Sequence, residues 1–225
     1  MWRRLLPVLV VAACAEGGPA DGLAPSGPVT PGKGDQSCPI VPADIMATQA
    51  PYWCGPVDSV NGGLMSDVNH FWHSHVLACG VGPDFPEGVD GAWSLFDYGT
   101  IYVGLAFVNG LATSGSLMPA QYVYAHEFGH ELEGHYGMRA PTMQQRELTA
   151  DCLAGYYLGS VVCRGLATEQ DVKTTLATAC IIADGTGNPI TDAETHGTCE
   201  QRMTSLAVGM KAYLAGDRPL DACAL

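Results

Sequence analysis

Basic residues are scarce in this chain of 225 residues. Ten lysines and arginines stand against 23 aspartates and glutamates, which gives a formal net charge of −13 at pH 7. An acidic surface repels phosphate backbones and anionic lipid headgroups, so the composition argues against nucleic-acid binding and against electrostatic docking on membranes. It agrees with the solvated surface of a secreted protein, and it does not identify a substrate.

The sequence also lacks apolar runs long enough to span a bilayer, which takes about 20 residues. The apolar segment Leu5–Val11 is shorter and follows two arginines, and small residues come after it. This order is typical of a signal peptide, which we expect at residues 1–13. The segment Val11-Ala12-Ala13-Cys14 is similar to a bacterial lipobox, so we expect Cys14 to be lipidated; the alternative is a soluble secreted protein.

No two of the nine cysteines form a CxxC pair, so a cysteine-based zinc site is not indicated. With Cys14 set aside for the lipid, an even number of scattered cysteines remains. In an exported protein such a set predicts a disulfide framework, but the sequence does not choose its connectivity. These cysteines are Cys38, Cys54, Cys79, Cys152, Cys163, Cys180, Cys199 and Cys223.

Glycine and proline are concentrated directly after Cys14. Residues 14–37 contain little else besides alanine and small polar residues, and they lack apolar periodicity, which is typical of a flexible tether. We therefore expect one folded domain over residues 38–225, held by its lipid at the bacterial cell envelope, in the periplasm or on the cell surface. The lipid would be its only attachment to the membrane.

The folded part favours helices with little sheet. Pro119 opens a helical stretch, as proline does in a first turn, and Thr168 followed by Asp171 resembles a capped N-terminus. Residues 101–108 are apolar and β-branched between two glycines, which predicts a strand. The expected helices are at about 64–77, 119–134, 144–162, 168–183 and 199–214, and residues 80–98 are expected to be loop.

The central motif is His126-Glu127-Phe128-Gly129-His130, inside the second of these helices. Residues four apart lie on one helix face, so His126 and His130 can bind one zinc ion. Glu127 is rotated about 100° from His126 and lies beside the metal, where it can act as a general base on a water molecule. We expect His126 and His130 to be metal ligands and Glu127 to be catalytic.

A third ligand follows in the next helix. Glu147 stands in Arg146-Glu147-Leu148-Thr149-Ala150-Asp151, and an antiparallel return would bring it over the two histidines. Three protein ligands and one open position are typical of a catalytic zinc site. Asp151 lies one turn further on the same face, where it can accept a hydrogen bond from a ligating histidine.

Other assignments compete with this one. His135 is an alternative third ligand, although it misses by one residue the position at which the metzincin pattern places its third histidine. His70, His73 and His75 do not have the spacing of a zinc helix. The cluster could also be a hydrogen-bonded helix pair without metal, or a metal site without catalysis.

With HEFGH, then ELTADCLAG and ETHGTCEQR, the chain resembles the bacterial putative neutral zinc metallopeptidase family. The resemblance covers roughly residues 75–223. It implies a zincin-like α+β fold, mainly helical with a small sheet, and zinc held by His126, His130 and Glu147. It also draws attention to His196, which could donate a hydrogen bond to an oxyanion or could merely cap a loop. The chain departs from the family pattern at Glu131 and Glu133, where a histidine and a glutamine are usual.

Together these features predict a metallopeptidase with one Zn²⁺ ion that hydrolyses a protein or peptide substrate. The alternative is a non-catalytic zinc-binding lipoprotein with a binding or structural role in the envelope.

Overall fold

The computed structural model describes residues 53–54, 59–74, 76–81, 91–94, 99–112, 115–138, 140–183 and 196–224. The expected signal peptide, Cys14, the expected tether and His75 lie outside these residues. The described part is mainly helical with a small sheet. The fold class is therefore the predicted one, a zincin-like α+β domain.

The sheet has the strand order β1-β2-β4-β3 in the described residues. Strands β1 (Trp53–Cys54), β2 (Leu77–Val81) and β4 (Thr100–Gly104) run parallel, whereas β3 (Ala92–Ser94) pairs antiparallel with β4. Trp93 of β3 stands opposite Tyr102 of β4, and their rings stack with centroids 5.2 Å apart. Cross-strand aromatic pairs of this kind stabilise short strands.

Two expectations about this region were wrong. The segment 80–98 is not all loop, because it contains the end of β2 and the whole of β3. The strand expected at 101–108 ends at Gly104, and α3 (Leu105–Ala112) follows at once. The last residue of β4, Gly104, pairs with the last residue of β2, Val81, and the rest of the apolar run is helical, a structure that a short apolar run also suits.

The first described helix, α2 (Ser59–Phe71), begins and ends earlier than the expected 64–77. His73 adopts a left-handed φ of 49°, and the amide of Ser74 donates to the carbonyl of Asn69. This hydrogen bond closes the helix in the manner of a Schellman motif, so the following residues are free to enter β2.

The remaining helices lie close to their predicted positions. They are α4 (Met118–His135), α5 (Met143–Cys163), α6 (Glu169–Ile181) and α7 (Cys199–Ala215). Thr142, Thr168 and Thr198 cap α5, α6 and α7 through their side chains. A short C-terminal helix, α8 (Pro219–Cys223), was not predicted.

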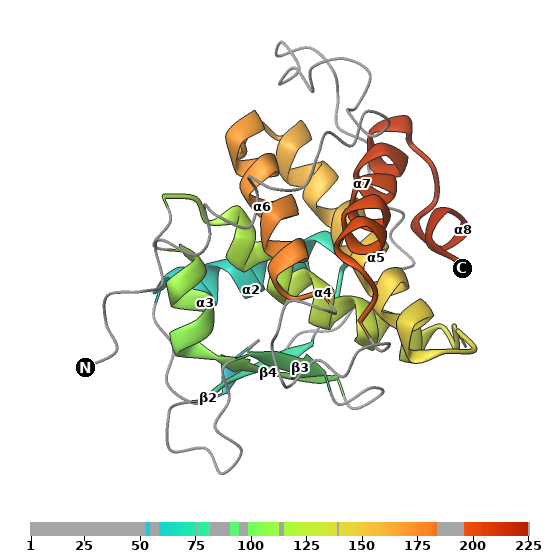
Figure 1. The fold of residues 1–225 in the computed structure, drawn as a ribbon. Coiled ribbons are helices and arrows are strands. Elements are labelled where there is room, and N and C mark those ends of the chain that lie inside the picture. Colours follow the sequence, from blue (N-terminus) through green and yellow to red (C-terminus); the bar gives the residue numbers. More distant parts are fainter. Residues whose placement is uncertain are drawn as a thin grey trace. The chain divides into compact units, whose positions relative to one another are not determined.

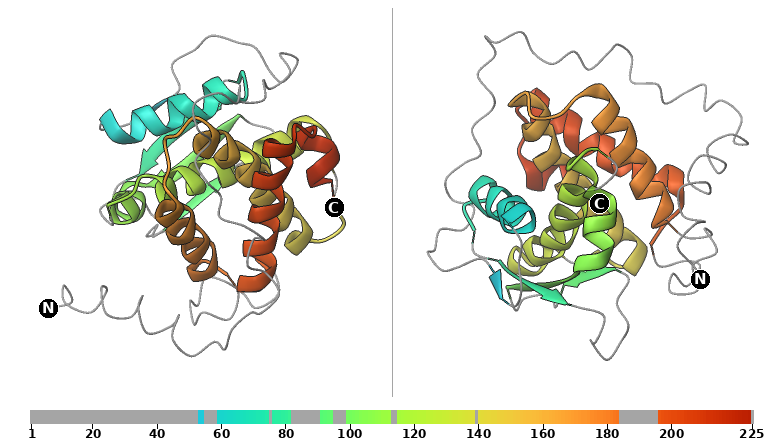
Figure 2. Two further views of the ribbon diagram at one scale, coloured as in Figure 1. Left: turned by 90° about the horizontal axis from the view of Figure 1, so that it is seen from above. Right: turned by 90° about the vertical axis from the view of Figure 1, so that its left-hand side faces the viewer.

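Helix α4 is the centre of the arrangement (Figure 1). The sheet packs on one side of α4, helices α5 and α6 pack on another, and α7 packs mainly on α5. The right-hand view of Figure 2 shows α6 and α7 on the side of α4 away from the sheet. Disulfides join Cys152 of α5 to Cys223 of α8, and Cys180 of α6 to Cys199 of α7. Cys79 and Cys163 are disulfide-bonded as well.

The core is rich in aromatic residues. Phe128 of α4 faces away from the two histidines of its motif and stacks on Trp72, with centroids 6.4 Å apart. Tyr156 and Tyr213 extend this cluster across α5 and α7. The motif thus anchors α4 in the core with one face and presents its histidines with the other. No helix among the described residues is long and apolar enough to cross a bilayer.

Candidate metal centre

Helices α4 and α5 approach closely at the motif glycine. A Cβ atom added at Gly129 would lie 2.9 Å from the Cα of Ala150, closer than real side chains come. Because both residues are small, the backbones of the two helices can nearly touch at this point. Glu147 lies one turn before Ala150 on α5, so the close approach carries its carboxylate to the histidines of α4.

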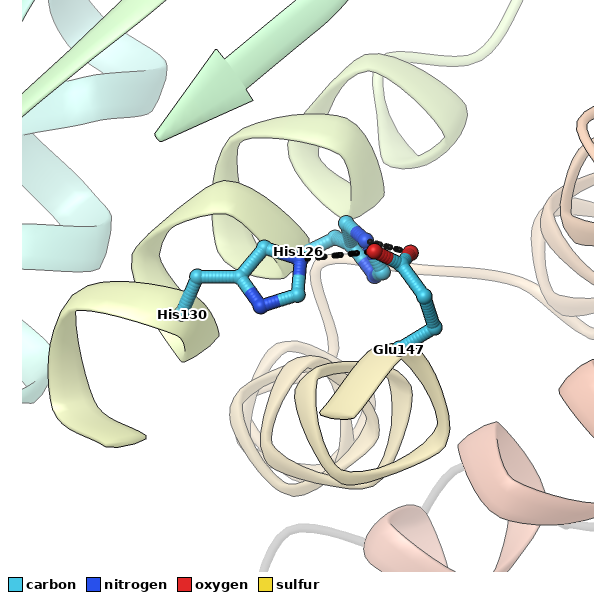
Figure 3. Close-up of side chains that lie close together, drawn as sticks. All are labelled: His126, His130 and Glu147. Atoms are coloured by element: carbon cyan, nitrogen blue, oxygen red, sulfur yellow. Dashed lines mark hydrogen bonds and ion pairs between the residues drawn. The ribbon is translucent and has the colours of Figure 1, made fainter. Parts of the chain in front are cut away.

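His126, His130 and Glu147 form one buried group (Figure 3). Figure 3 shows both imidazole rings of α4 pointing towards the carboxylate of Glu147 on α5. The Nε2 atom of His126 lies 3.1 Å from Oε2 of Glu147, and Nε2 of His130 lies 3.4 Å from Oε1. One ligand atom from each residue lies within 4.8 Å of the other two.

These residues fit a zinc ion. Zinc binds imidazole nitrogen and carboxylate oxygen at about 2 Å, so tetrahedral ligand atoms lie roughly 3.3 Å apart. The measured nitrogen–oxygen separations of 3.1 and 3.4 Å are close to this spacing. Two imidazoles and one carboxylate also leave a fourth position open, as catalytic zinc sites require.

The far side of the His126 ring is held by Asp151 and Arg202. The Nδ1 atom of His126 lies 2.9 Å from Oδ1 of Asp151. Arg202 of α7 donates to both oxygens of Asp151, from Nε at 2.8 Å and from Nη2 at 2.9 Å. The hydroxyl of Tyr122 also donates to Asp151, at 2.6 Å, and Arg202 donates to the carbonyl of Ile182. Three buried side chains therefore contact this carboxylate, those of His126, Tyr122 and Arg202.

The far side of the His130 ring faces Glu133. Its Nδ1 atom lies 3.2 Å from Oε2 of Glu133, which stands one turn later on α4. Arg146 of α5 also approaches this carboxylate, with its Nε atom 3.9 Å from Oε2. The neighbouring Glu131 turns instead to the sheet, where Ser94 and the amide of Gly99 donate to it.

Two carboxylates of the site, Glu147 and Asp151, are ionised. Burial alone would raise the pKa of Glu147, but hydrogen bonds from His126 and His130 lower it well below its usual range. Burial would likewise raise the pKa of Asp151, but the charges of Arg202 and His126 lower it to about 2. Both carboxylates therefore stay ionised at neutral pH and offer negative charge to the site.

Glu127 is buried next to this group. It follows His126 on α4, and only 7% of its surface is exposed. Burial raises the pKa of Glu127, and the neighbouring histidines counteract only part of this effect. A carboxylate with a raised pKa is a stronger proton acceptor, which suits the role of general base.

The structure separates the competing histidines from the group. His135 is exposed beyond the end of the motif and packs edge-on against Tyr136. His70 and His73 are exposed on and just after α2. His196 precedes α7, and the adjacent Gly197 lies against Leu148 of α5. This places the His196 segment beside the first turns of α5, and the catalytic role of His196 stays a prediction.

Sequence reasoning did not find the partners of the histidines on α7 or within α4. Neither Arg202 nor Tyr122 was assigned to the site, and Glu133 appeared only as a departure from a family pattern. The i, i+3 spacing of His130 and Glu133 could have suggested their contact. No local pattern could have indicated Arg202, which lies 76 residues from His126.

A family model described as "Putative neutral zinc metallopeptidase" matches residues 66–217. The chain is 28% identical to "Uncharacterized protein YpfJ" of Escherichia coli K12, over 55% of this chain and 50% of that protein. It is 29% identical to "Uncharacterized protein Rv2575" of Mycobacterium tuberculosis H37Rv, over 49% of this chain and 45% of that protein. The chain thus spans about half the length of these relatives, and no solved structure matches it. Because the family model covers most of the folded part, including α4, α5 and α7, the chain belongs to the family of putative neutral zinc metallopeptidases.

Proposed function

We propose that this protein is a zinc-dependent endopeptidase that hydrolyses peptide bonds. The observation that carries the proposal is the buried group of His126, His130 and Glu147 with Glu127 beside it. Two imidazoles and a carboxylate would hold the ion, and an adjacent buried carboxylate can move a proton. Membership of a family described as zinc metallopeptidases supports the same chemistry.

Each residue then has a distinct task. Zinc, when bound, supplies Lewis-acid chemistry that lowers the pKa of water and polarises a carbonyl group. Glu127 accepts a proton from the attacking water and passes it to the nitrogen of the leaving amine, as the carbon–nitrogen bond breaks. Asp151 keeps the His126 ring in the orientation that turns Nε2 towards Glu147. His196 is a candidate donor to the oxyanion.

The proposal includes a location and a substrate class. The N-terminal sequence supports export, with lipidation at Cys14 and a tether to the cell envelope. The substrate would then be a protein or peptide outside the cytoplasm. Replacing Cys14 by serine should release the protein from the membrane fraction, and unchanged fractionation would argue against the anchor.

The decisive test compares the purified protein with Glu127→Gln. The glutamine keeps the size of the side chain but cannot accept the proton, so hydrolysis of a peptide library should fall by at least about 100-fold. Zinc content, measured by mass spectrometry of the metal, should stay at one ion per chain. A protein that binds zinc and cleaves nothing, even with native Glu127, would favour the non-catalytic binding role instead.

The third ligand can be tested separately. Glu147→Ala should weaken zinc binding far more than His135→Ala, because only Glu147 faces both histidines. The reverse order would show that the wrong third ligand was chosen.

A further inference from the structure

We propose that Glu133 is a positioning residue of the metal centre, which holds His130 as Asp151 holds His126. The inference rests on the zinc site of the proposed function. His130 lies between two carboxylates: its Nε2 atom is 3.4 Å from Glu147, and its Nδ1 atom is 3.2 Å from Glu133. His126 has the same arrangement, with Nε2 at 3.1 Å from Glu147 and Nδ1 at 2.9 Å from Asp151.

The contact sets the tautomer of the ring. When the Nδ1 proton of His130 is donated to Glu133, the lone pair of the neutral imidazole is on Nε2, which faces the metal position. A carboxylate partner also makes the imidazole a stronger ligand, because it stabilises positive charge on the ring. Glu133 therefore acts on the metal through His130 and does not touch it.

The charge of Glu133 contributes little to the stability of the fold, because few groups compensate its burial. The residue is 1% exposed, and its Oε1 atom has no hydrogen-bond partner among the described residues. Its basic neighbour Arg146 approaches only to 3.9 Å and is itself partly exposed. A buried carboxylate with so little compensation destabilises a fold, so its contact with His130 is the interaction that accounts for it.

Arg146 connects this side of the site to α5. It directly precedes Glu147, so the first turns of α5 supply both the metal carboxylate and a positive charge near Glu133. Movement of this turn would change the two carboxylate contacts of His130 together.

Glu131 is a natural control for this proposal. It stands two residues before Glu133 on α4 and is also buried, but it accepts hydrogen bonds from Ser94 and Gly99 at the sheet. A change at Glu131 therefore disturbs the same helix without touching a histidine of the site.

The experiment measures zinc dissociation constants of the full-length protein by competition with a chelator. Glu133→Leu replaces the carboxylate by an apolar side chain and removes the acceptor, and zinc should bind about 10- to 100-fold more weakly. Glu133→Gln keeps an acceptor oxygen without the charge, so its loss of zinc affinity should be smaller than that of Glu133→Leu. The visible spectrum of the Co²⁺-substituted protein should change in Glu133→Leu, because the ring of one ligand is released.

Glu131→Gln should leave zinc affinity within about 2-fold of the native value while lowering thermal stability. Native affinity in Glu133→Leu, or an equal loss in Glu131→Gln, would overturn the role of Glu133. Should Glu133→Leu fail to fold, Glu133→Ala, which also lacks an acceptor for the Nδ1 proton of His130, decides, and native affinity in that variant overturns the proposal. If the native protein binds no zinc at all, the proposed function fails before this test begins.

Discussion

His126 and His130 lie one turn apart on α4 and share Glu147, but the protein holds them differently. His126 is held by Asp151 of α5, which accepts hydrogen bonds from Arg202 of α7 and Tyr122 of α4. His130 is held by Glu133 of its own helix, and the Nε atom of Arg146 lies 3.9 Å from that carboxylate. One half of the site thus depends on three helices, and the other depends mainly on one.

The difference shows which parts of the fold each half requires. The support of His126 includes Arg202, so it depends on the packing of α7 on α5. The contact of His130 with Glu133 needs only the i, i+3 spacing within α4. Substitutions that disturb the packing of α7 should therefore weaken the support of His126 first. Substitutions within α4 can change the orientation of His130 without unfolding the protein.

The largest effect is expected from Arg202→Leu, which breaks the His126 half. Arg202 is 1% exposed and makes two hydrogen bonds to the fully buried Asp151. Without it, Asp151 remains as a buried charge, and the free energy of unfolding should fall by about 3–5 kcal/mol. Urea denaturation of the metal-free protein measures this change.

Arg202→Lys is the matched control for that experiment. Lysine keeps the charge but lacks the planar guanidinium that contacts both oxygens of Asp151. The free energy of unfolding of Arg202→Lys should therefore lie between those of the native protein and Arg202→Leu. A change below about 1 kcal/mol in Arg202→Leu would show that the cluster contributes little to the fold.

Gly209→Ala should have the next largest effect, because it forces α7 away from α5. A Cβ atom at Gly209 would lie 1.9 Å from the carbonyl oxygen of Cys152 and 2.7 Å from the backbone nitrogen of Tyr156. Backbone atoms cannot rotate aside, so the helices must separate, at a loss of about 3 kcal/mol in the free energy of unfolding. Zinc affinity should fall as well, since Arg202 is carried by the same helix.

Gly63→Ala provides the control for this overpacking. Gly63 is exposed on α2, and a Cβ atom there would meet nothing within 4 Å. Alanine should stabilise that helix by up to about 1 kcal/mol through its higher helix propensity. Equal stability in the two variants would mean that α5 and α7 are not packed as closely as the structure has them.

The sequence predicted the features of the fold and the site that depend on residues close together in the chain. The spacing of His126 and His130 follows from the helix period, and Thr168 indicated where α6 begins. Glu147 and Asp151 were expected from their order after the motif, and the structure brings both to the histidines. These features depend on residues close together in the chain.

The features that were missed depend on distant partners. Strand β3 has only three residues and is defined by its pairing with β4, which no local pattern reveals. The helix α3 was mistaken for strand because a short apolar run suits either structure until its neighbours are known. Arg202 was not assigned to the site because its contacts require α7 to pack on α5.

The smallest effect is expected from Asp67→Asn, at an ion pair that has the geometry of Arg202 and Asp151 without their burial. Arg164 donates to both oxygens of Asp67 at 2.7 Å, but about a third of each side chain is exposed. Solvent screens such a pair, so the asparagine variant should lose only about 0.5–1 kcal/mol at neutral pH. The comparison therefore separates the effect of burial from that of hydrogen-bond geometry.

The pH dependence gives this last prediction its sign. Burial would raise the pKa of Asp67, but hydrogen bonds from Arg164 and Tyr157 lower it below the ordinary value of 3.8. A carboxyl group whose pKa is lowered by folding stabilises the folded state at pH values above its ordinary pKa. This stabilisation is lost as the pH falls through the pKa that the group has in the folded protein. Thermal melts over a range of acidic pH should therefore show the native protein and Asp67→Asn converging as the pH falls. A stability difference that stays constant with pH would mean that the charge of Asp67 does not contribute to it. A difference larger than the loss in Arg202→Leu would mean that burial is not what distinguishes the two ion pairs.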